Sequence, residues 1–394
     1  MTMGLKIWII TSSFPLNPRD SSAAAGLFVR DFALALSELG HRVTVVAPDK
    51  EPGEKEDPPG VSVRWFPWKG SRAALAYLKP YKPKDAIAML SLFWQSGKML
   101  DELMASQRPD HVMAMWAVPA GYFARRIKKR FGVPYTTWCL GSDIWTYGRY
   151  PLFKRVVRAV LRNSDLIYAD GLRLAEDVSR LAGRECPFLP SSRRLDRRRI
   201  QPAADRERGT RFLFVGRYAP VKGVDVLLEA MARFLHGNHR GHLYMFGGGP
   251  WEQEVRSRAA GSDLRGHVTV GGYADEETYV ANLAACDCFV IPSRMESIPV
   301  VLSDAVQMGK PLIVTDVGDM GRLLREYPAG LVVPAEDPGA LSESMVKMAT
   351  EDRARYTLHV TSLAEQFDLA HVARRWAEDV ASLRPQSASR AISH

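Results

Sequence analysis

The feature that most constrains this chain is a regular alternation of short apolar runs with amphipathic stretches, from one end to the other. Residues 6–11 and 43–47 are apolar runs of strand length, and residues 26–39 between them carry apolar side chains at helical spacing. Strands that alternate with helices in this way form parallel sheets covered by helices on both faces. The pattern therefore predicts an α/β fold.

The same alternation continues through both halves of the sequence. In the first half, strands are expected at residues 61–66, 111–115, 135–139 and 166–169, and helices at 86–104, 120–131, 152–163 and 172–182. In the second half, strands are expected at residues 211–215, 242–246, 267–270, 288–291, 312–315 and 330–333, and helices at 224–235, 251–260, 276–285, 299–308 and 338–349.

The alternation fails once, between residues 187 and 209, where Pro, Ser and Arg crowd together with little apolar periodicity. A chain of 394 residues is also too long for one ordinary core and fits two domains. We therefore place a first domain at residues 1–190, a linker at 191–209 and a second domain at 210–366. Residues 385–394 offer nothing to bury and are expected to form a disordered tail.

Composition indicates the class of protein and the cellular compartment. With 46% hydrophobic and 25% charged residues the chain reads as globular, and no apolar run approaches the roughly 20 residues needed to cross a bilayer. The apolar run near the start is too short for a signal peptide, and the four cysteines have neither disulfide nor metal spacing. We expect a cytoplasmic protein with reduced cysteines.

A net charge of +9 predicts an anionic partner. Basic residues cluster at 125–130, at the end of an expected helix, and at 193–199, in the polar connector. Such clusters fit a solvated face, since cations also complement the dipole at a helix end, or attraction to an anionic membrane surface at which the protein is peripheral. Both interpretations stay open at this point.

Ligands of wound parallel sheets bind outside the carboxyl ends of the strands. Arg217 and Lys222 follow one expected strand, and Glu296 follows another, with Asp304 in the helix after it. Cations of this kind neutralise phosphate oxygens, while carboxylates accept hydrogen bonds from hydroxyls. This set suits a sugar joined to a nucleoside diphosphate.

Other cofactors are not indicated. No Asp-x-Asp pair follows a strand, and no His, Cys or carboxylate cluster has the spacing of metal ligands, so no metal is expected. The three glycines at 247–249 lack the Gly-x-Gly-x-x-Gly spacing of a nicotinamide site.

In their order and spacing these motifs resemble the retaining glycosyltransferases of family 4. That family has the GT-B architecture, in which two Rossmann-like parallel-sheet domains face each other across an interdomain cleft. The resemblance spans nearly the whole chain and rests on Gly26, residues 40–46, 132–134 and 141–143, residues 215–217 with 222–223, and residues 246–250, 292–293, 296–304, 309–311 and 316–318.

The resemblance implies roles for particular residues. Arg217 and Lys222 would hold the donor diphosphate and stabilise it as a leaving group, and Glu296 would contact the hydroxyls of the donor sugar. Asp143 and Trp116 would lie on the acceptor side. Further donor contacts are implied for Gly26, Gly216 and Gly248, for the backbone of Ser297, Ile298, Pro299 and Val300, and for the Asp304 carboxylate at the ribose.

The chain also departs from the family pattern. Asp304 stands where the family more often has Glu, and Leu140 stands where it commonly has His. The structural alternatives are a core-facing or surface Asp304, a helix start at Gly26 without a ligand, a solvated loop acid at Glu296 and a turn cap at Asp143. The family's closing helix, which crosses back to the N-terminal domain, corresponds to residues 367–384.

The activity implied is a metal-independent, hexosyltransferase-like transfer with retention. The donor would be a UDP or GDP sugar and the acceptor a glycan or lipid-linked saccharide, in cell-surface polysaccharide or glycolipid synthesis. No resident cofactor and no nucleic acid partner are implied. A nucleotide-sugar epimerase of the same architecture and a non-catalytic sugar-nucleotide-binding partner of a glycan assembly complex are the alternatives.

Overall fold

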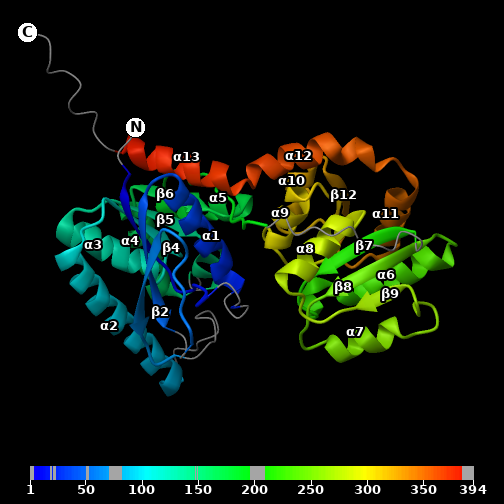
Figure 1. Ribbon diagram of the computed structural model, residues 1–394, viewed down its shortest axis with the longest axis horizontal. Helices are drawn as coiled ribbons and strands as arrows, with labels where there is room; N and C mark the ends of the chain where they lie inside the picture. The colour runs from blue at the N-terminus through cyan, green and yellow to red at the C-terminus, as the bar shows by residue number, and fades with distance from the viewer. Residues whose placement is uncertain are drawn as a thin grey trace, which may run out of the picture. The chain divides into compact units, whose positions relative to one another are not determined.

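The computed structural model describes residues 4–17, 20, 24–49, 53–70, 82–146, 148, 150–195 and 209–383, which fall into two compact units (Figure 1). The first unit runs to Arg193 and takes in the last segment from Leu369, and the second spans Arg194–Asp368. Most of the expected linker and the whole expected tail at 385–394 lie outside the described residues.

The first unit is built on a sheet of six parallel strands in the order β3-β2-β1-β4-β5-β6, as the alternation predicts. The strands are β1 (Lys6–Ile10), β2 (Arg42–Asp49), β3 (Val61–Pro67), β4 (His111–Met115), β5 (Tyr135–Cys139) and β6 (Leu166–Ala169). Strands β4 and β5 are buried along their whole length, because helices cover both faces of the sheet (Figure 1).

The helices of the first unit are α1 (Ala24–Glu38), α2 (Pro83–Ser106), α3 (Ala120–Phe131), α4 (Pro151–Asn163), α5 (Leu172–Ala182) and α13 (Leu369–Ser382). Two hydrophobic clusters fill the two sides of the sheet. One cluster takes side chains from helices α2 to α5, and the other takes them from α1 and α13. Helices α3 and α5 end at Gly132 and Gly183, whose φ angles of 71° and 72° are left-handed and favour glycine.

Helix α13 belongs to the first unit although it ends the described chain. Its Trp376 is fully buried, lies edge-on to Phe32 of α1, and donates a hydrogen bond from Nε1 to Oγ1 of Thr136 over 3.2 Å. One side chain therefore fixes the helix to α1 and to a strand 240 residues earlier in the chain.

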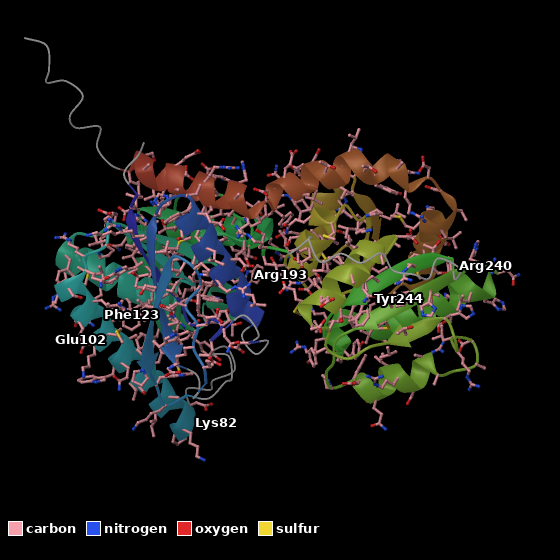
Figure 2. The ribbon with its side chains drawn as sticks, viewed as in Figure 1. Lys82, Glu102, Phe123, Arg193, Arg240 and Tyr244 are labelled. Carbon is pink, nitrogen blue, oxygen red and sulfur yellow. The ribbon has the colours of Figure 1, made fainter. Side chains whose placement is uncertain are left out.

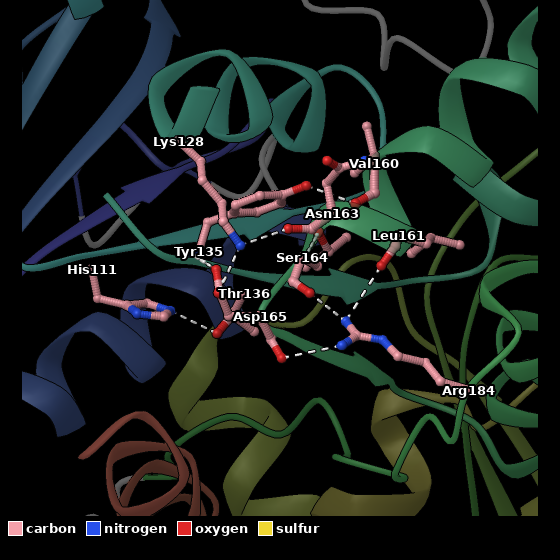
Figure 3. Close-up of polar contacts among 11 residues, drawn as sticks. His111, Lys128, Tyr135, Thr136, Val160, Leu161, Asn163, Ser164, Asp165 and Arg184 are labelled. Carbon is pink, nitrogen blue, oxygen red and sulfur yellow. Dashed lines mark hydrogen bonds and ion pairs between the residues drawn. The ribbon is translucent and has the colours of Figure 1, made fainter. Parts of the chain in front are cut away.

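A polar network fixes the ends of three helices near the start of β5 (Figure 3). Asp165 accepts hydrogen bonds from Lys128 at the end of α3 and from the backbone of Tyr135. Arg184, just after α5, donates to the carbonyl oxygens of Leu161, Ser164 and Asp165. Lys128 and Arg184 thus serve structure, since their charges are satisfied within the fold.

The second unit repeats the same architecture. Its six parallel strands have the order β12-β11-β10-β7-β8-β9. Read from β9, with β7 taken as the first strand, this order is 3-2-1-4-5-6, the same as in the first sheet. The strands are β7 (Thr210–Val215), β8 (Gly241–Phe246), β9 (Val268–Val270), β10 (Cys288–Ile291), β11 (Leu312–Thr315) and β12 (Gly330–Val333). The helices are α6 (Val224–His236), α7 (Glu252–Ala259), α8 (Glu276–Ala285), α9 (Val300–Gln307), α10 (Met320–Glu326), α11 (Pro338–Thr350) and α12 (Thr357–Gln366).

The expected strands and helices are confirmed, mostly to within one or two residues, and α3, α5 and β4 to β6 have the predicted bounds. Helices α10 and α12 were not predicted. All four cysteines are buried and free. Among the described helices, none combines the length and apolarity that crossing a membrane requires.

Candidate functional site

The centre of the candidate site is an ion pair between Lys222 and Glu296. Lys222 ends a short 3₁₀ turn after β7, and Glu296 lies in the loop after β10, the neighbouring strand. The two side chains are 24% and 15% exposed, so each is sheltered but reachable from solvent. The carboxyl ends of two adjacent parallel strands thus bring together a cation and a carboxylate that are 74 residues apart.

Two glycines permit this approach. Gly223 has φ +62°, and a Cβ atom there would lie 2.0 Å from the carbonyl oxygen of Pro292. Gly318 has φ +58°, and a Cβ atom there would lie 2.1 Å from the carbonyl oxygen of Glu296. Only glycine fits both the backbone conformation and the space, so these positions hold the Lys222 turn and the Glu296 loop against their neighbours.

Arg294 clamps the Lys222 turn to the Glu296 loop. Its guanidinium donates two hydrogen bonds of 2.8 Å to Asp225 and also pairs with Glu336, and its backbone N–H donates to the carbonyl of Val221. These partners raise the pKa of Arg294, and at Asp225 the Arg294 contacts outweigh burial and lower the pKa. Arg294 is a positioning residue that sequence reasoning missed, since its partners lie 69 and 42 residues away.

Arg217 lies on the same edge of the sheet, after β7, where it is exposed and has no ion pair with any residue that the structure describes. Glycines allow the backbone next to Arg217 to pack closely. A Cβ atom at Gly247 would lie 2.0 Å from the carbonyl oxygen of Gly216, and one at Gly248 would lie 2.7 Å from the ring of Tyr273. The loops after β7 and β8 therefore pack backbone to backbone beside Arg217.

Helix α9 begins at Val300, with Pro299 before it and no side-chain cap. The N–H group of Leu302 donates to the carbonyl oxygen of Pro299 over 2.9 Å, while those of Val300 and Val301 have no capping side chain. A helix start of this kind, next to Glu296 in the chain, suits an anion. The Oγ atom of Ser297 is buried and has no hydrogen-bond partner among the described residues. Ile298 completes the segment, and both it and Ser297 are half-buried.

Asp304 lies within α9 and is fully buried, where its Oδ2 accepts a hydrogen bond of 2.6 Å from the Tyr279 hydroxyl. Tyr279 is itself almost fully buried, so the Asp304 carboxylate is not exposed to a ribose in this arrangement. The geometry matches the core-facing alternative considered from the sequence, and Tyr279 is a partner that sequence reasoning missed.

The remaining predicted residues belong to the first unit. Asp143 is fully buried, and its two carboxylate oxygens accept hydrogen bonds from the backbone N–H groups of Ala117, over 2.6 Å, and Leu140, over 3.3 Å. Because these amides follow β4 and β5, Asp143 ties two adjacent loops at the carboxyl edge of the sheet. Trp116 begins the first loop, half-buried and at φ +71°, a conformation that a bulky residue rarely adopts.

Gly26 lies near the start of α1. A Cβ atom there would lie 2.9 Å from the backbone of Phe14, in the segment that follows β1. Helix α1 therefore needs glycine to pack against that segment, and this requirement holds whether or not a ligand approaches.

Asp143 gives a testable pH dependence. Burial raises its pKa to about 6, and the amides of Ala117 and Leu140 only partly oppose this. Since the pKa of the unfolded chain is lower, the folded protein binds the extra proton, and the free energy of unfolding falls as the pH rises from about 4 to about 6. Relative to Asp143→Asn, the wild-type free energy of unfolding should fall by about 2–3 kcal/mol between about pH 4 and pH 7.

Denaturant unfolding of both proteins at each pH measures this difference. A difference that stays constant across the range would contradict the pKa of the folded state.

The described residues contain no group of three or more His, Cys, Asp or Glu side chains placed to hold a metal ion. The groups that the structure places at the carboxyl edge of the second sheet are cations, a carboxylate, backbone amides and glycine loops. Two Rossmann-like sheets of the same strand order are what the resemblance to GT-B glycosyltransferases implies.

Comparisons with known proteins agree with this class. The model of the glycosyl transferases group 1 family matches residues 196–359, and the model of the glycosyl transferase 4-like domain matches residues 24–187. The chain belongs to the family 4 glycosyltransferases and has the GT-B fold, which confirms the expected family and fold class.

Relatives with curated names are also glycosyltransferases. The chain is 26% identical over 374 residues to the putative teichuronic acid biosynthesis glycosyltransferase TuaC of Bacillus subtilis, covering 88% of this chain and 90% of that protein. It is 32% identical over 169 residues to the phosphatidyl-myo-inositol mannosyltransferase of Mycobacterium leprae, covering 42% and 44%.

Solved structures share the fold. Sucrose-phosphate synthase from Thermosynechococcus elongatus matches with a TM-score of 0.72 at 18% identity, covering 96% of this chain and 99% of that one. HepE of Anabaena, solved in complex with UDP, matches with a TM-score of 0.70 at 16% identity, covering 96% and 100%.

Proposed function

We propose that this glycosyltransferase moves a hexose-like sugar, with retention of configuration, from a UDP or GDP sugar to a glycan or lipid-linked saccharide. The observation that carries the proposal is the contact of Lys222 with Glu296 at the carboxyl ends of adjacent strands. A phosphate-binding cation and a hydroxyl-binding carboxylate in contact are what a sugar diphosphate requires at its junction.

In the proposed reaction the bond between the sugar's anomeric carbon and the diphosphate oxygen breaks while the acceptor oxygen bonds to that carbon from the same face. The acceptor proton passes to a phosphate oxygen of the leaving group. Lys222 and Arg217 stabilise the negative charge that grows on the diphosphate, and the N–H groups at the start of α9 add to this. Glu296 fixes the sugar by accepting hydrogen bonds from its hydroxyls.

Lys222 is paired with Glu296. The diphosphate therefore competes with Glu296 for the lysine, and the sugar hydroxyls replace the lysine as partners of the carboxylate. Arg294 keeps both loops in place through this exchange, because its own partners, Asp225 and Glu336, lie outside the pair.

The nature of the acceptor rests on the relatives. The named function of TuaC is in teichuronic acid biosynthesis, and the Mycobacterium leprae relative is named as acting on a phosphatidylinositol. We extend this to the chain as a role in cell-surface polysaccharide or glycolipid synthesis, with no resident cofactor, no metal requirement and no nucleic acid partner, at the cytoplasmic side of a membrane.

A panel of UDP, GDP, ADP and CDP sugars tests the proposal, with and without saccharide acceptors and with a chelator present. We expect one nucleoside diphosphate to raise the melting temperature, because ligand binding stabilises the folded state. We also expect nucleotide release that depends on an acceptor. Isomerisation of the donor without an acceptor, or binding without turnover, would contradict transfer.

A further inference from the structure

Six exposed large apolar side chains of the first unit lie on, or directly before, three of its helices, α2, α3 and α4. Leu90 and Trp94 of α2 are 70% and 75% exposed, and Leu152 of α4 is 71% exposed. The other three are Ile87, Tyr122 and Tyr150. Single exposed apolar residues are ordinary on protein surfaces, but a concentration of them on neighbouring helices marks an interaction site.

Tyr122, Tyr150 and Leu152 lie where their helices begin, toward one edge of the sheet. Helices α2, α3 and α4 follow strands β3, β4 and β5, so each begins at the carboxyl edge of the sheet. Ile87, Leu90 and Trp94 are three or four residues apart and therefore share one side of α2. Figure 2 labels Lys82 and Glu102 near the two ends of this helix.

The three helices are neighbours. Phe93 of α2 lies 5.7 Å from the ring of Tyr122 and 5.4 Å from that of Phe123 in α3, measured between ring centroids. Helix α3 in turn contacts α4. The exposed apolar residues thus lie on three adjacent helices, and we call the exposed surface of α2, α3 and α4 the α2–α4 face.

The same face carries cations that the fold does not use. Helices α3 and α4 contain nine Lys or Arg residues and no Asp or Glu. Six of the nine have no ion pair with any residue in the described part of the chain, and these are Arg125, Lys129, Lys154, Arg155, Arg158 and Arg162. The other three pair with Asp101 or Asp165.

The cations are grouped rather than scattered. Arg125 and Lys129, four residues apart on α3, line a hollow of about 330 Å³ together with Tyr122. Arg155, Arg158 and Arg162 repeat at helical spacing on the exposed side of α4. A group of exposed like charges in which cations outnumber acids attracts an anionic surface.

We propose that the α2–α4 face docks on an anionic lipid bilayer. Lys and Arg side chains near such a surface are attracted to its acidic headgroups, while Trp, Tyr and Leu side chains insert at the boundary between headgroups and acyl chains. Exposed Trp, Leu and Ile side chains on helices next to cations fit a bilayer better than a nucleic acid, whose phosphates make no apolar contact with Leu and Ile.

The α2–α4 face gives the enzyme a lipid partner in addition to its donor and acceptor substrates. Asp143 and Trp116 lie at this same carboxyl edge of the first sheet. Docking there would bring the edge expected to receive the acceptor close to lipid headgroups.

Vesicle flotation of the full chain, without donor or acceptor, tests the proposal independently of catalysis. The vesicles are phosphatidylcholine alone, or phosphatidylcholine with about a third of the lipid replaced by phosphatidylglycerol. The protein should float with the anionic vesicles only, and its apparent affinity should fall about tenfold or more when salt is raised from about 0.05 M to about 0.5 M. Failure to float with anionic vesicles at low salt would overturn the proposal.

Two double variants test whether the α2–α4 face is the surface that binds the vesicles. Arg155→Glu with Arg158→Glu should weaken binding to anionic vesicles about tenfold or more, and Leu90→Glu with Trp94→Glu should do the same. The matched controls lie in the second unit and are Arg240→Glu with Lys347→Glu, and Leu358→Glu at a side chain 79% exposed. Arg240 is labelled in Figure 2. The controls should keep wild-type affinity, and all variants should keep the wild-type melting temperature because the changes are at the surface.

Two results would contradict the assignment. Equal losses in the controls would show that net charge alone drives binding. Sedimentation that shows a dimer, abolished by Leu90→Glu with Trp94→Glu while no variant or wild type binds vesicles, would show that the α2–α4 face joins two copies of the chain.

Discussion

Lys222→Ala is expected to lower kcat by about 100- to 1,000-fold, because it removes a preorganised positive charge from the position where the leaving diphosphate gains negative charge. It should also weaken binding of the free nucleoside diphosphate, since the same ammonium contacts the ground-state phosphate. Single-turnover kinetics and calorimetric titration with the diphosphate measure the two effects separately.

The controls for this variant separate charge from fold. Lys222→Arg keeps a cation and should recover part of the rate, whereas Lys347→Ala removes an exposed lysine of the same unit and should leave both quantities unchanged. If Lys222→Ala binds the diphosphate and turns over like the wild type, the lysine does not contact the leaving group.

Glu296→Ala is expected to abolish measurable transfer while leaving nucleoside diphosphate affinity within about twofold of wild type, because the carboxylate contacts the sugar and not the phosphates. Removing Glu296 also frees Lys222 from its ion pair, so any change within this twofold range should be a gain in diphosphate affinity. The observable signature is a loss of kcat with intact binding, the opposite of a general folding defect.

Glu296→Gln and Glu343→Ala are the controls for this variant. Gln keeps an oxygen acceptor and should retain a small part of the rate, and Glu343 is an exposed acid of α11 whose loss should have no effect. Full turnover by Glu296→Ala would remove the carboxylate from the proposed mechanism and leave it as an ordinary partner of Lys222.

The strands and most helices could be predicted because their signals are local. Helices α3 and α5 have apolar residues at helical spacing and end at glycines in the left-handed conformation. Residues within and next to each helix therefore predict where it lies. Helix α10 has seven residues, too few for a clear period, and α12 follows α11 after a short polar turn without a Pro or Gly break. For these reasons neither α10 nor α12 was predicted.

The site was predicted only in part for a different reason. The positions of Lys222 and Glu296 follow from strand ends and motif spacing, which the sequence carries. The role of Arg294 depends on Asp225 and Glu336, and the burial of Asp304 depends on Tyr279, so both arise from contacts between distant segments. No local pattern distinguishes an Asp that faces ligand from one that a buried hydroxyl satisfies.

The central claim is that one sugar nucleotide lies against both Lys222 and Glu296, and a crystal structure with the bound donor tests it most directly. The account predicts a phosphate oxygen within hydrogen-bond distance of Lys222 Nζ, the Arg217 guanidinium beside the diphosphate, and a sugar hydroxyl donating to Glu296 in place of the present ion pair. A donor bound elsewhere on the chain, with Lys222 and Glu296 still paired to each other, would contradict it.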